Sequence, residues 1–302
     1  MKKRTLFVIL GLVIGTSGCS FSAGTIATPT PTPVDEVGTV VAATLQAHTA
    51  FPTEDISTPI ASTEATTQAG GTPVSFERVS FVVPNEVGTG ATTEKMTAVE
   101  SNTDAPWDVA PTHSRFTLSG YPLQEKFHEP RIFVYPAGEY AGVNPTAAEQ
   151  IDRLRKALMG ATLLAETLPT VPFFNAAPLI AAQIKIIPFQ NGGGAVRSLT
   201  QYAQYAAPIN NNELFYHFQG LSGDGNYYVV GILPVTAAIL PEDENPEASV
   251  PEGGVPIPTA VGPNDVYYFS VIEKLNSLSP DAFTPSLSAL DALVQSLVIT
   301  NP

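Results

Sequence analysis

Arg197, Gln201 and His217 are polar residues on two predicted strands and are candidates for a binding site. Residues 214–219 read Leu-Phe-Tyr-His-Phe-Gln, and the side chains of a strand alternate between its two faces. His217 and Gln219 are therefore expected on one face, and Arg197 and Gln201 of the preceding predicted strand are expected to join them. Such a cluster on a covered face would bind an anionic or polar ligand. The alternative is that His217 is a hydrogen-bonded structural residue under a loop.

Two further histidines suggest a second kind of chemistry. His113 precedes a predicted strand, and His128 lies in a segment with two glutamates, Glu125 and Glu129. A metal site would join these four residues, because imidazole and carboxylate groups are ordinary zinc ligands. Their spacing matches no ligand motif, and this favours the other interpretation, a solvated loop around His128.

Motifs of well-known reaction classes do not occur in the sequence. It contains no Walker loop, HExxH, GxSxG or CxxC motif. Residues 222–226 (Ser-Gly-Asp-Gly-Asn) resemble part of a calcium loop, but the later bidentate Glu is missing, so we predict a hairpin turn. Residues 192–194 are glycines that precede a predicted strand, and a phosphate-binding loop would precede a helix. The sequence thus implies no cofactor and favours a protein that is not an enzyme.

The chain has a single cysteine, Cys19, behind a segment that is typical of export signals. Lys2, Lys3 and Arg4 form a positive start, residues 6–14 are mostly apolar, and residues 16–18 are small. The apolar run is shorter than the roughly 20 residues that a membrane-spanning helix needs. Its pattern predicts a secretory signal peptide over residues 1–18.

The end of this segment resembles the lipobox of bacterial lipoproteins, in the residues Ser17-Gly18-Cys19, with Thr16 where such boxes usually have Leu, Val or Ile. The resemblance implies cleavage before Cys19 and transfer of diacylglycerol to its sulfur. Acyl chains such as palmitate would then hold the protein on the extracytoplasmic face of the cell membrane. The alternative is a plain secreted protein with a coincidental cysteine.

The next segment has the composition of a spacer. Residues 20–72 are rich in Pro, Thr, Ser, Ala and Gly, and residues 28–33 alternate Thr and Pro. Proline favours extended backbone, and such a segment buries too little apolar surface to fold. We therefore predict that residues 19–72 form a lipidated, disordered stalk. Residues 73–302 are predicted to form one domain, which includes an acidic, Pro-rich loop over residues 241–263.

The folded part is expected to be α+β. An antiparallel meander sheet of about six or seven strands would be covered by three helices, with the disordered stalk before it. The expected strands are residues 74–84, 115–121, 131–135, 182–190, 195–204, 213–221 and 227–235. The expected helices begin at Pro145 after the N-cap Asn144, after Asp265, and at Thr284-Pro285. This order of elements resembles the fold of the PsbP and Mog1 group.

Composition limits the partners of the protein. The formal net charge is −14, which disfavours binding to nucleic acids and to anionic lipids through protein charge. We expect a non-catalytic binding or assembly module, tethered to the membrane through Cys19, with a protein partner or a small ligand at the cell surface. The alternatives are an extracytoplasmic enzyme or small-ligand receptor with a pocket near Arg197 and His217, and a structural envelope protein.

Overall fold

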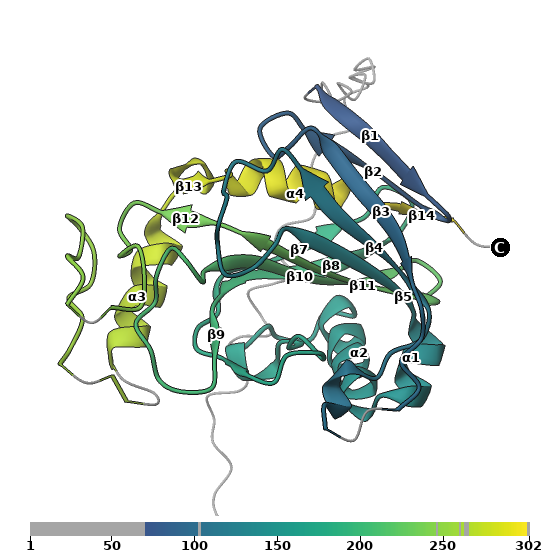
Figure 1. Ribbon diagram of the computed structural model, residues 1–302, viewed down its shortest axis with the longest axis horizontal. Coiled ribbons are helices and arrows are strands. Elements are labelled where there is room, and N and C mark those ends of the chain that lie inside the picture. Colours follow the sequence, from purple (N-terminus) through teal and green to yellow (C-terminus); the bar gives the residue numbers. More distant parts are fainter. Residues whose placement is uncertain (1–69, 102–103, 246, 260, 263–265, 301–302) are drawn as a thin grey trace, which may run out of the picture. The chain divides into compact units, whose positions relative to one another are not determined.

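A computed structural model describes residues 70–101, 104–245, 247–259, 261–262 and 266–300 (Figure 1). The chain divides into two units, residues 1–63 and 64–302, and every described residue belongs to the second unit. The predicted signal peptide, Cys19 and nearly all of the predicted stalk lie outside the described residues.

Seven antiparallel strands form the main sheet, in the spatial order β3-β4-β5-β11-β10-β8-β7. Their bounds are β3 (Gly90–Met96), β4 (His113–Ser119), β5 (Arg131–Pro136), β7 (Ala182–Pro188), β8 (Gly193–Thr200), β10 (Phe215–Ser222) and β11 (Tyr227–Pro234). Two meanders, one of β3 to β5 and one of β7 to β11, meet where β5 pairs with β11. The predicted α+β class with an antiparallel sheet of this size is confirmed.

One face of the main sheet packs against a second layer of mixed structure. This layer contains a three-stranded sheet of β1 (Gly71–Phe76), β2 (Val79–Pro84) and β14 (Val298–Ile299), together with α3 (Val266–Ser277) and α4 (Leu287–Gln295). In Figure 1, α4 and the smaller sheet lie above the main sheet. Apolar side chains from all of these elements form the largest hydrophobic core.

The opposite face is covered by α1 (Ala137–Val143) and α2 (Pro145–Leu158), which lie below the sheet in Figure 1. The start of α2 is as predicted: the Asn144 side chain accepts a hydrogen bond from the Ala147 N–H at 3.1 Å, and Pro145 occupies the first turn. Ile151 and Leu154 are buried on the side of α2 that packs against the sheet.

Two short strand pairs complete the fold. They are β12 (Thr236–Ala237) with β13 (Phe283–Thr284), and β6 (Ala177–Pro178) with β9 (Tyr202–Ala203). Both pairs lie in the segments that connect the longer elements, and each pair holds two of these segments together. Among the described residues the acidic, Pro-rich segment after β12 contains no further strand or α-helix until α3 begins at Val266.

Some expected elements differ from the observed ones. Residues 74–84, predicted as one strand, form the hairpin of β1 and β2, because Glu77 adopts a left-handed conformation (φ 52°) and reverses the chain. The edge strand β3 was missed, since its side chains after Gly90 are mostly polar and exposed. Four α-helices are described rather than three, since α1 was not expected, and α4 begins after the N-cap Ser286 instead of at Thr284.

The packing of Phe218 against Gly231 provides a test of this fold. The two residues face each other across β10 and β11, and a methyl group added at Gly231 would lie 1.9 Å from the Phe218 ring. We expect Gly231→Ala to lower the free energy of unfolding by about 1–3 kcal/mol through overpacking, as measured by urea denaturation. In contrast, Gly138→Ala in α1 meets no atom within 4 Å and should be neutral or slightly stabilising. Equal losses for both variants would contradict this packing.

Candidate functional site

The pairing of β8 with β10 separates two of the predicted site residues. Arg197 lies opposite Phe218, and His217 lies opposite Ser198. Residues that are opposite each other share a face of the sheet, and consecutive residues alternate, so Arg197 and His217 point to opposite faces. Their expected convergence in one pocket is therefore wrong.

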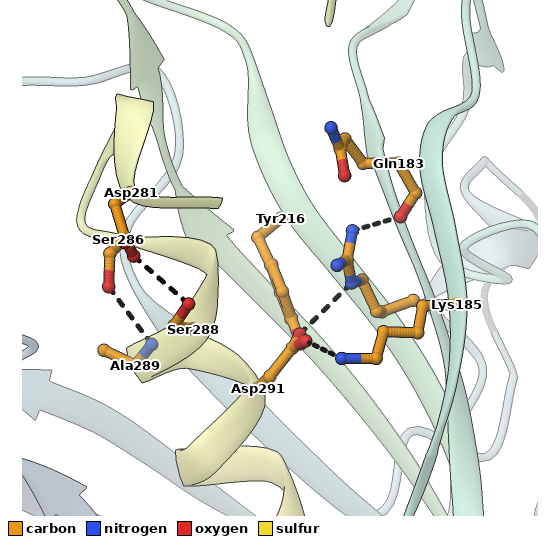
Figure 2. A network of polar contacts seen from close by, with 9 residues as sticks. Gln183, Lys185, Tyr216, Asp281, Ser286, Ser288, Ala289 and Asp291 are labelled. Carbon is orange, nitrogen blue, oxygen red and sulfur yellow. Dashed lines mark hydrogen bonds and ion pairs between the residues drawn. The ribbon is translucent and has the colours of Figure 1, made fainter. Parts of the chain in front are cut away.

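Arg197 belongs to an ion-pair network between α4 and the main sheet. Figure 2 shows the network around Asp291, Tyr216 and Lys185. The Arg197 Nε donates to Asp291 Oδ1 at 3.1 Å, and the Tyr216 hydroxyl donates to the same oxygen at 2.8 Å. Lys185 Nζ lies 2.8 Å from Asp291 Oδ2. The guanidinium also donates to the backbone carbonyl of Gln183 and lies 5.7 Å from the centre of the Tyr216 ring. We name Arg197, Asp291, Tyr216 and Lys185 the Asp291 network.

The Asp291 network is buried at its centre and reaches the surface at Lys185, whose side chain is 56% exposed. The side chain of Arg197 is only 3% exposed and that of Asp291 14%. Burial and the neighbouring carboxylate of Asp291 raise the pKa of Tyr216, so this hydroxyl stays protonated and donates. Because each charged group already has partners in α4, β7, β8 or β10, the network joins a helix to the sheet and uses its polar groups within the protein.

An irregularity in β7 extends this connection to α3. Gln183 has a left-handed backbone (φ 53°) at the point where the register of β7 and β8 shifts. Its N–H donates to Asn276 Oδ1 at 2.6 Å, and its Nε2 donates to the carbonyls of Leu275 and Leu278 at 2.8 and 3.1 Å. One residue thus contacts both Arg197 and the carboxyl end of α3.

His217 is buried on the other face of the sheet, among hydrogen-bonded side chains. Its Nε2 lies 3.0 Å from Gln219 Nε2, which also donates to the Thr170 carbonyl at 2.7 Å. The nitrogen of the Gln219 amide can only donate, so the His217 Nε2 accepts. The Gln219 Oε1 accepts from the Tyr228 hydroxyl. Burial lowers the pKa of His217 to about 3, and this geometry matches the alternative interpretation of a structural histidine.

Gln201 belongs to a third, separate cluster. Its Oε1 accepts from the Asn210 N–H at 3.0 Å, and its Nε2 donates to the Pro208 carbonyl at 3.1 Å and to Glu213 Oε2 at 2.7 Å. Burial raises the pKa of the Glu213 carboxyl, against the opposing effect of its bond from Asn210. Gln201 therefore holds the connection between β9 and β10, away from both Arg197 and His217.

A concave site does lie on the His217 face, at a place that the sequence did not predict. We call it the aromatic hollow; its volume is about 350 Å³, and its lining residues are Phe127, His128, Glu129, Arg131, Phe133, Phe173, Phe174 and Ile232. Ile232 lies opposite His217 in one strand pair and opposite Arg131 in the next. The hollow is therefore a neighbour of His217, although His217 itself does not line it.

Aromatic rings form the walls of the hollow. The His128 ring is stacked on Phe174, with 5.2 Å between ring centres and 9° between planes, and its edge meets Phe215 at 4.6 Å. Phe173 stands at 90° to Phe174, with the ring centres 5.5 Å apart. Phe127, at the rim, is 65% exposed. Edge-to-face pairs of this kind hold rings in defined orientations, so the walls are preformed.

Two polar atoms of the hollow have no partner. Three buried side-chain atoms in the described part of the chain lack a hydrogen bond, and two of them are His128 Nε2 and Arg131 Nε. Buried polar atoms are nearly always paired, so such a pair of exceptions indicates a place where a further group binds. Arg131 is ion-paired through its Nη2 with Glu129, and burial lowers the pKa of His128 to about 4. The segment around His128 is a largely exposed loop, as expected, but the His128 ring itself packs inward on Phe174 and Phe215.

The residues of the suggested metal site are not brought together. His113 Nδ1 lies 2.8 Å from the Pro111 carbonyl, and its ring packs on Tyr135 with 4.3 Å between centres. Across the described residues, no three His, Cys, Asp or Glu side chains form a group that could hold a metal ion. Residues 223–226 connect β10 to β11, as predicted for a hairpin turn.

Comparison with protein-family models, with curated proteins and with solved structures finds no match to this chain. The resemblances to lipoprotein signals and to the PsbP and Mog1 fold stay predictions. Within the described ranges, none of the helices has the length and apolar character needed to cross a membrane.

The Asp291 network should make a large contribution to stability. We expect Asp291→Ala to lower the free energy of unfolding by about 3 kcal/mol, because it leaves the Arg197 charge buried without its carboxylate. Urea denaturation followed by circular dichroism measures this loss. The matched control is Asp152→Ala, which breaks an exposed ion pair of 2.7 Å with Lys156 in α2 and should have little effect.

A double variant distinguishes the effect of breaking the Arg197–Asp291 ion pair from the effect of removing side-chain volume. Replacing Arg197 by Met and Asp291 by Leu removes both charges and keeps apolar volume, so stability should return most of the way to that of the wild type. A double variant as unstable as Asp291→Ala would show that the two charges do not act as a pair.

The buried His217 should make stability depend on pH. Its folded pKa of about 3 lies below the ordinary histidine value of 6.5. The unfolded chain therefore binds more protons between these values, and stability falls as the pH is lowered through 6.5. From pH 7 to pH 5 this histidine should remove about 2 kcal/mol. We expect His217→Gln to lose this part of the dependence in urea denaturation at the two pH values. The same change at His48, in the predicted stalk, should leave it unaltered.

Proposed function

We propose that this chain is a lipoprotein, held on the extracytoplasmic face of the cell membrane by a lipid on Cys19. We propose further that residues 73–302 act as a non-catalytic binding or assembly module, and that the aromatic hollow is where the module meets its ligand or partner. The observation that carries this proposal is the open, ring-lined hollow with two buried polar atoms that have no partner.

The composition of the first 72 residues supports the anchor. Cys19 is the sole cysteine, so an internal disulfide cannot account for it, and it stands where signal cleavage is expected. Two acyl chains give stable attachment, whereas one gives only reversible binding. The Pro- and Thr-rich residues that follow would hold the module away from the bilayer.

The internal bonding of the other polar residues favours the hollow over the site expected from sequence. Arg197, Gln201 and His217 each have their hydrogen bonds within the protein, in three separate clusters. A receptor or enzyme built around Arg197 and His217 is therefore not the function that we propose. Phe127, in contrast, presents its ring to solvent at the rim of the hollow, as binding surfaces often do.

The anchor is tested by labelling a bacterial host with an alkyne fatty acid. Wild-type protein should carry the label and sediment with membranes, because the Cys19 sulfur is its only thiol for diacylglycerol transfer. Cys19→Ala should carry no label. Ser17→Ala, which keeps a small residue in the lipobox, should be labelled as well as the wild type. Full labelling of Cys19→Ala would contradict the lipid anchor.

The binding role is tested by photo-crosslinking in cells of the source organism. A photoreactive phenylalanine at position 127 should capture a partner or ligand that is found by mass spectrometry. The matched control is position 269 in α3, where Phe269 is exposed to a similar degree, 60%, but does not line the hollow. Capture from position 269 and none from position 127 would overturn the assignment of the hollow as the binding site.

A further inference from the structure

We infer that the aromatic hollow binds a small aromatic carboxylate, with the ring of the ligand among the phenylalanines and its carboxylate on Arg131. This inference rests on the proposed role of the hollow as a binding site, and it adds the chemical class of the ligand. Four properties of the hollow carry it: its size, its walls, the kind of hydrogen-bonding group that it lacks, and its charge.

The size of the hollow suits one or two rings. Its volume of about 350 Å³ is near the lower end of the roughly 300–1,000 Å³ that ligand pockets have. An engineered cavity of about 150 Å³ is large enough for benzene. There is thus room for a substituted ring, and little room for a sugar chain or a folded peptide.

The walls of the hollow present rings in alternating orientations. Phe133 and Phe173 meet at 62° with 5.1 Å between centres, and Phe173 and Phe174 meet at 90° with 5.5 Å between centres. An added planar ring can continue this edge-to-face pattern, and each such pair contributes beyond simple burial. The walls therefore favour a flat aromatic group over a flexible aliphatic one.

The group that Arg131 lacks in the hollow is a hydrogen-bond acceptor. A guanidinium N–H can only donate, so the N–H at Arg131 Nε needs an acceptor as its partner. The His128 ring is neutral near pH 7, because burial lowers its pKa to about 4, and it donates from Nε2 when the proton is on that nitrogen. A carboxylate oxygen is an acceptor that both groups can share.

The hollow holds one cation, Arg131, and one anion, Glu129, and an anionic ligand can take the place of Glu129. Glu129 is the present partner of Arg131, but its side chain is 61% exposed, and such surface ion pairs contribute little. Glu129 can therefore turn into water and leave Arg131 to the carboxylate of a ligand. A cationic ligand would place its charge beside Arg131 and would bring no acceptor for the Arg131 Nε.

The test is calorimetric titration of the lipidated full chain in nanodiscs with three probes of matched shape. Phenylacetate should bind with a Kd on the order of 0.1–1 mM, as expected for a ligand of this size. Phenylacetamide, which lacks the charge, should bind at least about tenfold more weakly, since a charged acceptor bonds more strongly to a guanidinium. Phenethylamine should not bind measurably.

Variants locate the binding in the hollow. Arg131→Gln should weaken phenylacetate binding about tenfold or more. Its matched control is Arg115→Gln, which removes another strand arginine that is paired with a glutamate, Glu94, outside the hollow. Phe173→Leu should also weaken binding, and Phe269→Leu should not. If Arg131→Gln fails to fold by circular dichroism, Arg131→Lys keeps a charge but loses the Nε–H and serves instead.

Several results would overturn the inference. They are equal or tighter binding of phenylacetamide or phenethylamine, no binding of phenylacetate, and unchanged binding in both a folded Arg131 variant and Phe173→Leu. If position 127 still captures a partner in cells while phenylacetate does not bind, the ligand class is wrong and the proposed function stands. If position 127 captures nothing and only position 269 does, the proposed function itself fails.

Discussion

The ion pair between Arg197 and Asp291 constrains the arrangement of this protein more than any other single interaction. A guanidinium buried to 97% must have a carboxylate and further acceptors around it, or the desolvation of its charge is not offset. That requirement sets the position of α4 over β8 and β10 and uses the bulge at Gln183 to supply a backbone carbonyl. The same bulge bonds to the end of α3, so the helices of this layer and the sheet hold one another in place.

The two faces of the main sheet differ in how completely they are covered. One face is sealed by α3, α4 and the smaller sheet around a large apolar core. The other face is covered by α1 and α2 over part of its width, and a separate aromatic cluster lies beyond them, around Phe215, Tyr202 and Ile232. The aromatic hollow opens at this cluster. A rigid, closed face and a partly uncovered face are what a binding module needs, because the closed side keeps the walls of the hollow preformed.

The polar residues on the His217 face connect the hollow to the sheet. Buried His217, Gln219 and Tyr228 form a hydrogen-bonded chain behind it, which ends at the carbonyl of half-buried Thr170. Chains of this kind are rigid when every member is satisfied, and each member depends on the others. Thr170 lies three residues before Phe173, so this chain also helps to position the segment that supplies two walls of the hollow. His217 is thus a structural neighbour of the proposed site rather than part of it.

Much of the secondary structure followed from sequence alone, because it depends on local patterns. Asn144 and Pro145 identified the start of α2, alternation placed His217 and Gln219 on one face, and the turn at 222–226 identified a hairpin. The prediction of a lipid anchor likewise depends only on the sequence around the single cysteine, Cys19. The register of β8 against β10 is a long-range property, and it alone decided that Arg197 and His217 face apart. The hollow was equally hidden, since His128, Phe174 and Phe215 meet only after folding brings three distant segments together.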